Sequence, residues 1–233
     1  MKLVTTIGFD ADDTLWHHER HYKLTEGRFR DLLADYATHD HLEERLRAAE
    51  LRNLAHYGYG VKGFTLSMIE TAIEVTEGRA PAGVIAEILE AGRDLLAHPV
   101  ETFDGVAETL EQLKPHFRLV VITKGDLFDQ ERKLAASGVD HFFDAVEIVS
   151  EKNAATYARI FARHGEGAAR SAMVGNSLKS DILPALEAGA HAVHIPSEHS
   201  WALDHADSPG SQERFMQIGS IGDLAGLFLK LEA

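Results

Sequence analysis

From Phe103 onward, short apolar segments of strand length alternate with segments of helical periodicity. The apolar segments cover residues 119–122, 146–149, 172–174 and 191–195. This alternation is typical of a parallel sheet with helices on both faces, because parallel neighbours need long crossover connections. A further apolar, β-branched run at residues 4–9 predicts a buried strand that precedes them in the chain. We therefore predict an α/β fold whose ligands collect at the carboxyl ends of its strands.

Residues 17–100 show a different pattern, in which helical periodicity dominates and no strand signal appears. Apolar residues recur at i, i+3, i+4 and i+7 in the first part of this block: Phe29, Leu32, Leu33 and Tyr36. A later helix should begin near Pro81 and bury Ile85, Ile88, Leu89, Leu95 and Leu96. We predict a core formed by residues 1–16 and 101–233, with residues 17–100 inserted as a separate helical unit. Residues 197–212 are polar and predict a loop.

The composition excludes several classes of function. The chain has no cysteine, which excludes disulfides, thiolate metal sites and cysteine nucleophiles. Its formal net charge of −14 argues against sequence-independent binding to nucleic acid. Its amino-terminal apolar run is too short for a signal peptide, and no segment approaches the roughly 18 apolar residues of a membrane helix. We expect a cytoplasmic protein that binds neither nucleic acid nor membrane.

The clearest chemical signal is a group of carboxylates directly after the first strand: Asp10, Asp12 and Asp13. Carboxylates two residues apart on an extended segment share a face, and their proximity costs free energy unless a cation offsets it. A solvated acidic turn before a helix would also explain three aspartates. The position after a buried strand favours a functional site.

Residues 8–16 read GFDADDTLW and resemble the first motif of the haloacid dehalogenase superfamily, in its phosphatase branch. The resemblance implies a Rossmann-like core with an inserted helical cap. It implies that Asp10 attacks phosphorus and ligates magnesium. Asp12 would act as general acid and base, and its backbone carbonyl would also ligate the metal. Thr14 would support the loop by hydrogen bonding.

Two further motifs of the family are matched at later strand ends. Thr123 matches a residue that holds phosphoryl oxygens, and Lys124 and Gly125 follow it as candidate substrate-binding residues. Many members have asparagine where this chain has Lys124. Lys152, after the segment 146–149, matches the lysine that offsets the charge of the nucleophile and the phosphoryl group. Asn153 follows it where proline is common.

The fourth motif is matched by residues 174–181, VGNSLKSD. Asp181 matches the second acidic metal ligand of the family, whereas Asn176 stands where the first aspartate is usual. An amide oxygen can still ligate Mg²⁺, which prefers oxygen ligands. The predicted metal ligands are therefore Asp10, Asp12, Asn176 and Asp181.

The resemblance implies a magnesium-dependent phosphomonoester hydrolase with an aspartyl-phosphate intermediate. Its substrate would be a small phosphorylated metabolite, and the protein a monomer or homodimer. The superfamily's dehalogenases lack the second aspartate, so Asp12 argues against a dehalogenase, which is one alternative. A non-catalytic phosphate-binding module is another. The loop at residues 57–63, with Lys62, is a candidate for specificity, although its tyrosines could equally be core and its glycines turns.

Overall fold

The computed structural model describes residues 4–197, 201, 206–210 and 213–229. The chain forms two compact units. The first comprises Met1–Glu19, Val100–Lys124 and Glu131–Ala233, and the second comprises Arg20–Pro99 and Gly125–Gln130. Much of the loop predicted at residues 197–212 lies outside the described residues.

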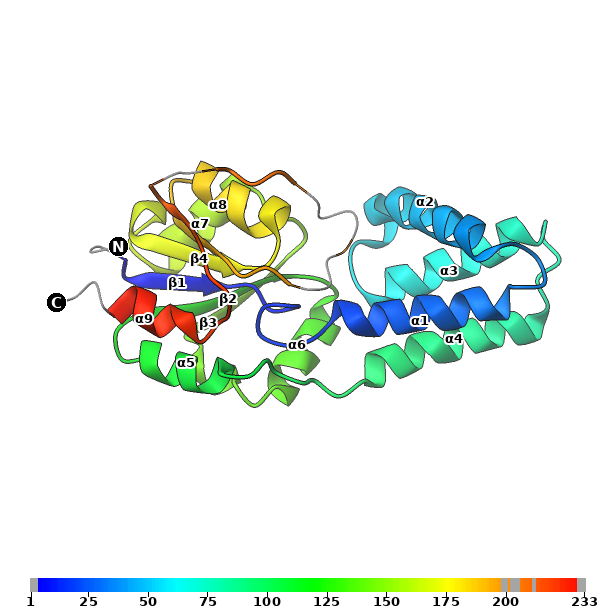
Figure 1. Cartoon of the computed structure of the whole chain (residues 1–233), viewed down its shortest axis with the longest axis horizontal. Coiled ribbons are helices and arrows are strands. Elements are labelled where there is room, and N and C mark those ends of the chain that lie inside the picture. Colours follow the sequence, from blue (N-terminus) through cyan, green and yellow to red (C-terminus); the bar gives the residue numbers. More distant parts are fainter. Residues whose placement is uncertain (1–3, 198–200, 202–205, 211–212, 230–233) are drawn as a thin grey trace. The chain divides into compact units, whose positions relative to one another are not determined.

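The first unit contains, in its described part, a six-stranded parallel sheet with the order β3-β2-β1-β4-β5-β6. Figure 1 shows β1 inside this sheet, and Phe9 pairs with Val121 of β2 on one side and with Val174 of β4 on the other. The predicted parallel α/β sheet is confirmed. The strands are β1 (Thr6–Phe9), β2 (Arg118–Lys124), β3 (Ala145–Val149), β4 (Ser171–Gly175), β5 (His191–His194) and β6 (Phe215–Gln217).

Helices cover both faces of the sheet, as predicted. On one face, Ile7, Phe9 and Val121 pack in one core cluster with residues of α5 (Val106–Leu113), α6 (Leu127–Ala136) and α9 (Asp223–Leu229). On the other face, Val120, Ile122 and Met173 pack with α7 (Ala154–His164) and α8 (Leu183–Glu187). The interiors of the central strands β2 and β4 thus read as continuous apolar runs because both of their faces are buried. Their carboxyl ends meet at one edge.

Strand β6 was not predicted from the sequence. It is three residues long, and Phe215 pairs with Ala192 of β5 at the edge of the sheet. Two partly buried apolar residues followed by a glutamine give no periodic signal. The pairing is therefore determined by the exposed edge of β5 rather than by local propensity.

The second unit is helical in its described residues, as expected for this block. The helices are α1 (Glu19–Leu32), α2 (His39–Tyr57), α3 (Val61–Val75) and α4 (Ala82–Ala97). Their core includes Phe29, Leu33, Leu42, Leu46, Phe64, Met68, Ile88 and Leu95. The prediction that Leu89 is buried is wrong, since it is 40% exposed. No helix in the described part of the chain is long and apolar enough to cross a membrane.

Candidate active site

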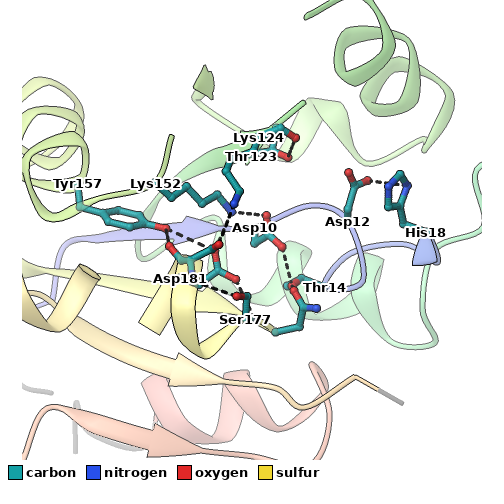
Figure 2. A network of polar contacts seen from close by, with 12 residues as sticks. Asp10, Asp12, Thr14, His18, Thr123, Lys124, Lys152, Tyr157, Ser177 and Asp181 are labelled. Atoms are coloured by element: carbon teal, nitrogen blue, oxygen red, sulfur yellow. Dashed lines mark hydrogen bonds and ion pairs between the residues drawn. The ribbon is translucent and has the colours of Figure 1, made fainter. Parts of the chain in front are cut away.

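Asp10 lies at the carboxyl end of β1, where its backbone N–H donates to the Val174 carbonyl of β4 (2.9 Å). Lys152 follows β3, and its Nζ donates to Asp10 Oδ1 (2.5 Å) and to Asp181 Oδ1 (2.7 Å), as Figure 2 shows. The three side chains are at most 9% exposed. The structure therefore brings together three of the predicted site residues, from the ends of three strands.

Burial and the nearby Asp181 carboxylate raise the pKa of Asp10 to about 7, against a lowering by the Lys152 ammonium. Burial lowers the pKa of Lys152, but the two carboxylates outweigh this and hold it above its usual range. Lys152 is therefore a fixed positive charge between two acids. A further cation at this cluster would also favour the ionised form of Asp10, because opposite charge stabilises a carboxylate.

Asp181 is held by a short turn of π-helix, Leu178–Ile182, that follows β4. The Ser177 hydroxyl accepts from the N–H of Ser180, and the Ser177 N–H donates to Asp181 Oδ2 (3.0 Å). A Cβ at Gly175 would collide with the Asp181 carboxylate, so the glycine leaves the room that this side chain needs. Turns of π-helix occur often at functional sites. The local backbone thus fixes the predicted metal-ligating carboxylate.

Asn176 and Asp10 are linked through Thr14. The Thr14 hydroxyl contacts both Asp10 Oδ2 and Asn176 Oδ1, each at 3.3 Å. On the far side, His194 Nε2 lies 3.0 Å from the backbone oxygen of Asn176, to which it donates. The side-chain oxygens of Asp10 and Asn176 are therefore held on either side of one buried hydroxyl group.

Asp12 points to a different set of partners. Lys133 Nζ donates to its two carboxylate oxygens (2.6 and 2.9 Å), and Trp16 Nε1 donates to Oδ1 (2.8 Å). His18 Nδ1 lies 3.5 Å from the same oxygen, the contact dashed in Figure 2. Burial raises the pKa of Asp12, but His18, Lys133 and Trp16 outweigh this and hold it well below its usual range. In this arrangement Asp12 is a carboxylate.

Asp13 connects the loop to the start of α1. Its carboxylate accepts from the backbone N–H groups of His18 (3.0 Å) and Glu19 (2.9 Å). Burial raises the pKa of Asp13 to about 6, although these two N–H groups lower it. Its φ of 57° lies in the left-handed region, which aspartate tolerates better than most residues. Asp13 is therefore a helix-capping residue rather than a third site carboxylate.

Thr123 and Lys124 end β2, next to β1 in the sheet. Thr123 is buried, with its hydroxyl directed at the Lys124 carbonyl (3.3 Å). The Lys124 ammonium donates to Ser180 Oγ (2.8 Å) and lies 3.7 Å from Glu151. It therefore links the end of β2 to the turn that carries Asp181. Phosphate contacts for Thr123, Lys124 and Gly125 stay a prediction.

The specificity loop predicted at residues 57–63 lies in the second unit. Helix α3 begins at Val61, within this loop. A Cβ at Gly63 would lie 2.9 Å from the Gly58 carbonyl oxygen, so the glycine lets α3 lie close to the end of α2. Within the same unit, Lys62 Nζ pairs with Asp126 (2.9 Å) and the Tyr57 hydroxyl donates to Glu70 (3.0 Å). The Lys62 side chain is 58% exposed in this ion pair.

Residues 4–189 match the model of the haloacid dehalogenase-like hydrolase family. The chain belongs to this family. A haloacid dehalogenase-like family hydrolase from Xanthomonas campestris is similar along almost its whole length. It is 39% identical, with a TM-score of 0.88, over 98% of this chain and 92% of that chain. The family resemblance expected from the four motifs is confirmed.

Two relatives of this hydrolase are named phosphatases. A glyceraldehyde 3-phosphate phosphatase from Methanothermobacter thermautotrophicus is 38% identical over 115 residues, 46% of this chain and 51% of the relative. An N-acylneuraminate-9-phosphatase from Mus musculus is 31% identical over 132 residues, 53% of this chain and 52% of the relative. The chain thus spans about half the length of these relatives. An L-2-haloacid dehalogenase from Xanthobacter autotrophicus shares the fold, at 16% identity and a TM-score of 0.67 over 96% of this chain and 98% of that one.

The donor atoms of the hydrolase fit a hard divalent cation such as Mg²⁺. Asp10, Asp181 and Asn176 offer two carboxylates and one amide oxygen, and hard cations prefer oxygen ligands. Asp12 can contribute only its backbone carbonyl while its carboxylate faces Lys133. Accordingly, no cluster of three or more His, Cys, Asp or Glu side chains suited to a metal occurs among the described residues.

Sequence reasoning missed several residues that shape this site. Lys133, Trp16 and His18 hold Asp12, and Tyr157 and Ser177 hold the turn with Asp181. The spacing of Trp16, four residues after Asp12, is a signal that could have been used. The contacts of Lys133 and Tyr157 could not be predicted in this way, because they depend on how helices and strands distant in the sequence pack.

Proposed function

We propose that this hydrolase is a magnesium-dependent phosphomonoesterase that uses Asp10 as its nucleophile. The observation that carries the proposal is that Asp10 and Asp12, two residues apart in the sequence, contact different lysines. Asp10 is held by Lys152 next to Asp181, whereas Asp12 is held by Lys133. A nucleophile and an acid–base group need different environments, because only the second must exchange a proton.

The residues suggest a reaction in two steps. In the first, an Asp10 oxygen forms a bond to phosphorus, the phosphorus–ester oxygen bond breaks, and the leaving oxygen takes a proton from Asp12. In the second, water attacks phosphorus and gives a proton to Asp12, and the bond to Asp10 breaks. Lys152 would offset negative charge on Asp10 and on the phosphoryl group throughout. Thr123 would hold a phosphoryl oxygen through its hydroxyl.

The state of Asp12 in the structure suits the second step. As a carboxylate it can accept the proton of the attacking water. To protonate the leaving group in the first step, Asp12 has to carry a proton at that moment, which its contact with Lys133 disfavours. Proton delivery therefore requires a negative charge near Asp12 that favours its protonated form, and the bound phosphate ester would supply that charge.

Asp10, Asp181, Asn176 and the Asp12 carbonyl would hold the metal. Bound Mg²⁺ would screen the repulsion between an anionic nucleophile and an anionic ester. The crystal structure of the HAD-hydrolase YfnB from Bacillus subtilis, which shares the fold at 18% identity and a TM-score of 0.65, contains magnesium. This supports the choice of metal.

A small phosphorylated metabolite is the proposed substrate. The two named phosphatases support this class, since both names specify a phosphorylated small molecule. The acidic charge of −14 argues against a nucleic acid. A cytoplasmic location and a monomeric or homodimeric state stay predictions.

The test is phosphate release from a panel of phosphate monoesters, with and without Mg²⁺, by the wild type and Asp10→Asn. Asp144→Asn is the matched control, because it is the same substitution in the same unit, where Asp144 pairs with Lys114 instead. We expect release by the wild type and the control only, and its loss on chelation. Release by Asp10→Asn would contradict the proposal. Halide release from a haloacid without Mg²⁺ would favour a dehalogenase, and saturable phosphate binding without turnover would favour a binding module.

A further inference from the structure

Lys133 is a buried cation that none of the four sequence motifs includes. It lies on α6 and is 6% exposed. Its Nζ reaches both oxygens of Asp12, at 2.6 and 2.9 Å, and lies 3.4 Å from His18 Nδ1. The contact joins residues 121 positions apart in the sequence. It therefore depends on the packing of α6 against the loop after β1.

Burying an ammonium group is costly, and an apolar side chain of similar length would avoid that cost. Lys133 is nevertheless buried, with its ammonium group on both oxygens of Asp12. Its charge has a local effect, which is to fix the Asp12 carboxylate.

The site contains two buried lysines with separate targets. Lys152 contacts Asp10 and Asp181, the predicted nucleophile and metal ligand. Lys133 contacts Asp12, which also accepts from Trp16 on the same loop. A carboxylate held at both oxygens by one ammonium and at one of them by an indole N–H has little rotational freedom. The orientation of Asp12 is therefore set by Lys133 and Trp16, with His18 Nδ1 3.5 Å from the same oxygen that Trp16 contacts.

We propose that Lys133 is a positioning residue for the hydrolysis, holding the Asp12 carboxylate in the orientation from which it exchanges protons with the leaving group and water. This inference rests on the proposed phosphatase function. Without Lys133, Asp12 would sample several rotamers, and small misplacements of a reacting group slow a reaction strongly. Substrate binding, which depends on other residues, would change little.

The experiment is a double-mutant cycle between Lys133→Met and Asp12→Asn, with kcat and KM measured at saturating Mg²⁺. Two substrates are compared: p-nitrophenyl phosphate, whose leaving group needs little protonation, and glycerol phosphate, whose alkoxide leaving group needs a proton. Lys114→Met is the matched control, because Lys114 donates to Asp144 at 2.8 Å in the same unit. Lys133→Arg tests whether a cation alone restores function, and thermal unfolding checks that each variant is folded.

We expect Lys133→Met to lower kcat on glycerol phosphate roughly 10- to 100-fold, with a smaller loss on p-nitrophenyl phosphate and KM changed little. In the Asp12→Asn background the same change should have almost no further effect. We also expect Lys133→Arg to recover part of the lost kcat, and Lys114→Met to leave kcat unchanged.

Equal losses from Lys133→Met in both backgrounds would overturn the positioning role, because a merely structural effect does not depend on Asp12. A change in KM alone, or no loss, would overturn it as well. Absence of turnover by the wild type on every ester would instead overturn the proposed function, and this inference with it. Turnover by the wild type thus distinguishes a failure of the positioning role from a failure of the proposed function.

Discussion

Lys152 is a buried cation between two carboxylates, and its replacement by methionine should destabilise the protein strongly. Its Nζ lies 2.5 Å from Asp10 Oδ1 and 2.7 Å from Asp181 Oδ1, and its side chain is 2% exposed. Removing one partner from a buried ion pair costs about 3–5 kcal/mol, because the remaining charge is left without compensation. For a chain of this length that loss corresponds to a fall in Tm of roughly 6–20 °C.

The assay is urea unfolding of Lys152→Met at several pH values, in the presence of a chelator. Lys114→Met is the control: its pair with Asp144 is about one-third exposed, and such pairs contribute about 0–1 kcal/mol. The destabilisation by Lys152→Met should be larger at pH 8 than at pH 5. Without Lys152 the pKa of Asp10, already raised to about 7, rises further, so Asp10 stays protonated in the folded variant at a pH where it is ionised in the unfolded chain. Keeping that proton costs more free energy as the pH rises, so the variant loses most stability at high pH.

A destabilisation by Lys152→Met no larger than that by Lys114→Met at pH 8 would refute this reasoning. It would mean that water or a rearranged side chain compensates the two carboxylates as well as Lys152 does. A loss that grows as the pH falls would refute the assignment of the raised pKa to Asp10.

Two further predictions concern stability. Burial raises the pKa of Asp144, but Lys114 and the Leu119 N–H outweigh this and lower it; Asp144→Asn should therefore cost about 1 kcal/mol at pH 7. Urea unfolding should show this difference shrinking below about pH 4, as the wild-type carboxyl is protonated, and a pH-independent difference would contradict the assignment. Tyr157→Phe removes the hydroxyl that donates to the Ser180 carbonyl (3.0 Å) and should cost about 1–3 kcal/mol, and an unchanged Tm would contradict this contact.

The centre of the sheet could be predicted because its strands β2 and β4 are buried on both faces and therefore read as apolar runs. The segments around Val121 and Val174 have this property, and both pair with β1. Strand β6, which contains Phe215, could not be predicted, because its single pairing depends on the free edge of β5. The periodicity of the helices predicted burial less well, since Leu89 lies on an apolar stripe of α4 but is exposed. Periodicity shows which face of a helix is apolar, but not how much of that face is buried.

The candidate site could be predicted in part, because residues at the carboxyl ends of parallel strands meet. Asp10, Lys152 and Asp181 come together in this way. The main partner of Asp12 could not be predicted, because the direction of its side chain depends on Lys133 of α6, 121 positions further along the chain. The contact of Asn176 with the site could not be predicted either. The Thr14 hydroxyl connects Asn176 to Asp10, and the sequence does not give the distances between these atoms. The catalytic and metal-binding roles of these residues stay predictions.

The central claim is that Asp10 becomes phosphorylated, and its most direct test is to trap that intermediate. The enzyme is mixed with an excess of a substrate ester, quenched after a fraction of a turnover and treated with borohydride, which reduces an aspartyl phosphate to homoserine. Peptide mass spectrometry then locates the modified residue. The account predicts homoserine at position 10 in the wild type and none in Asp10→Asn. Modification at another aspartate, or unmodified Asp10 during rapid turnover, would contradict it.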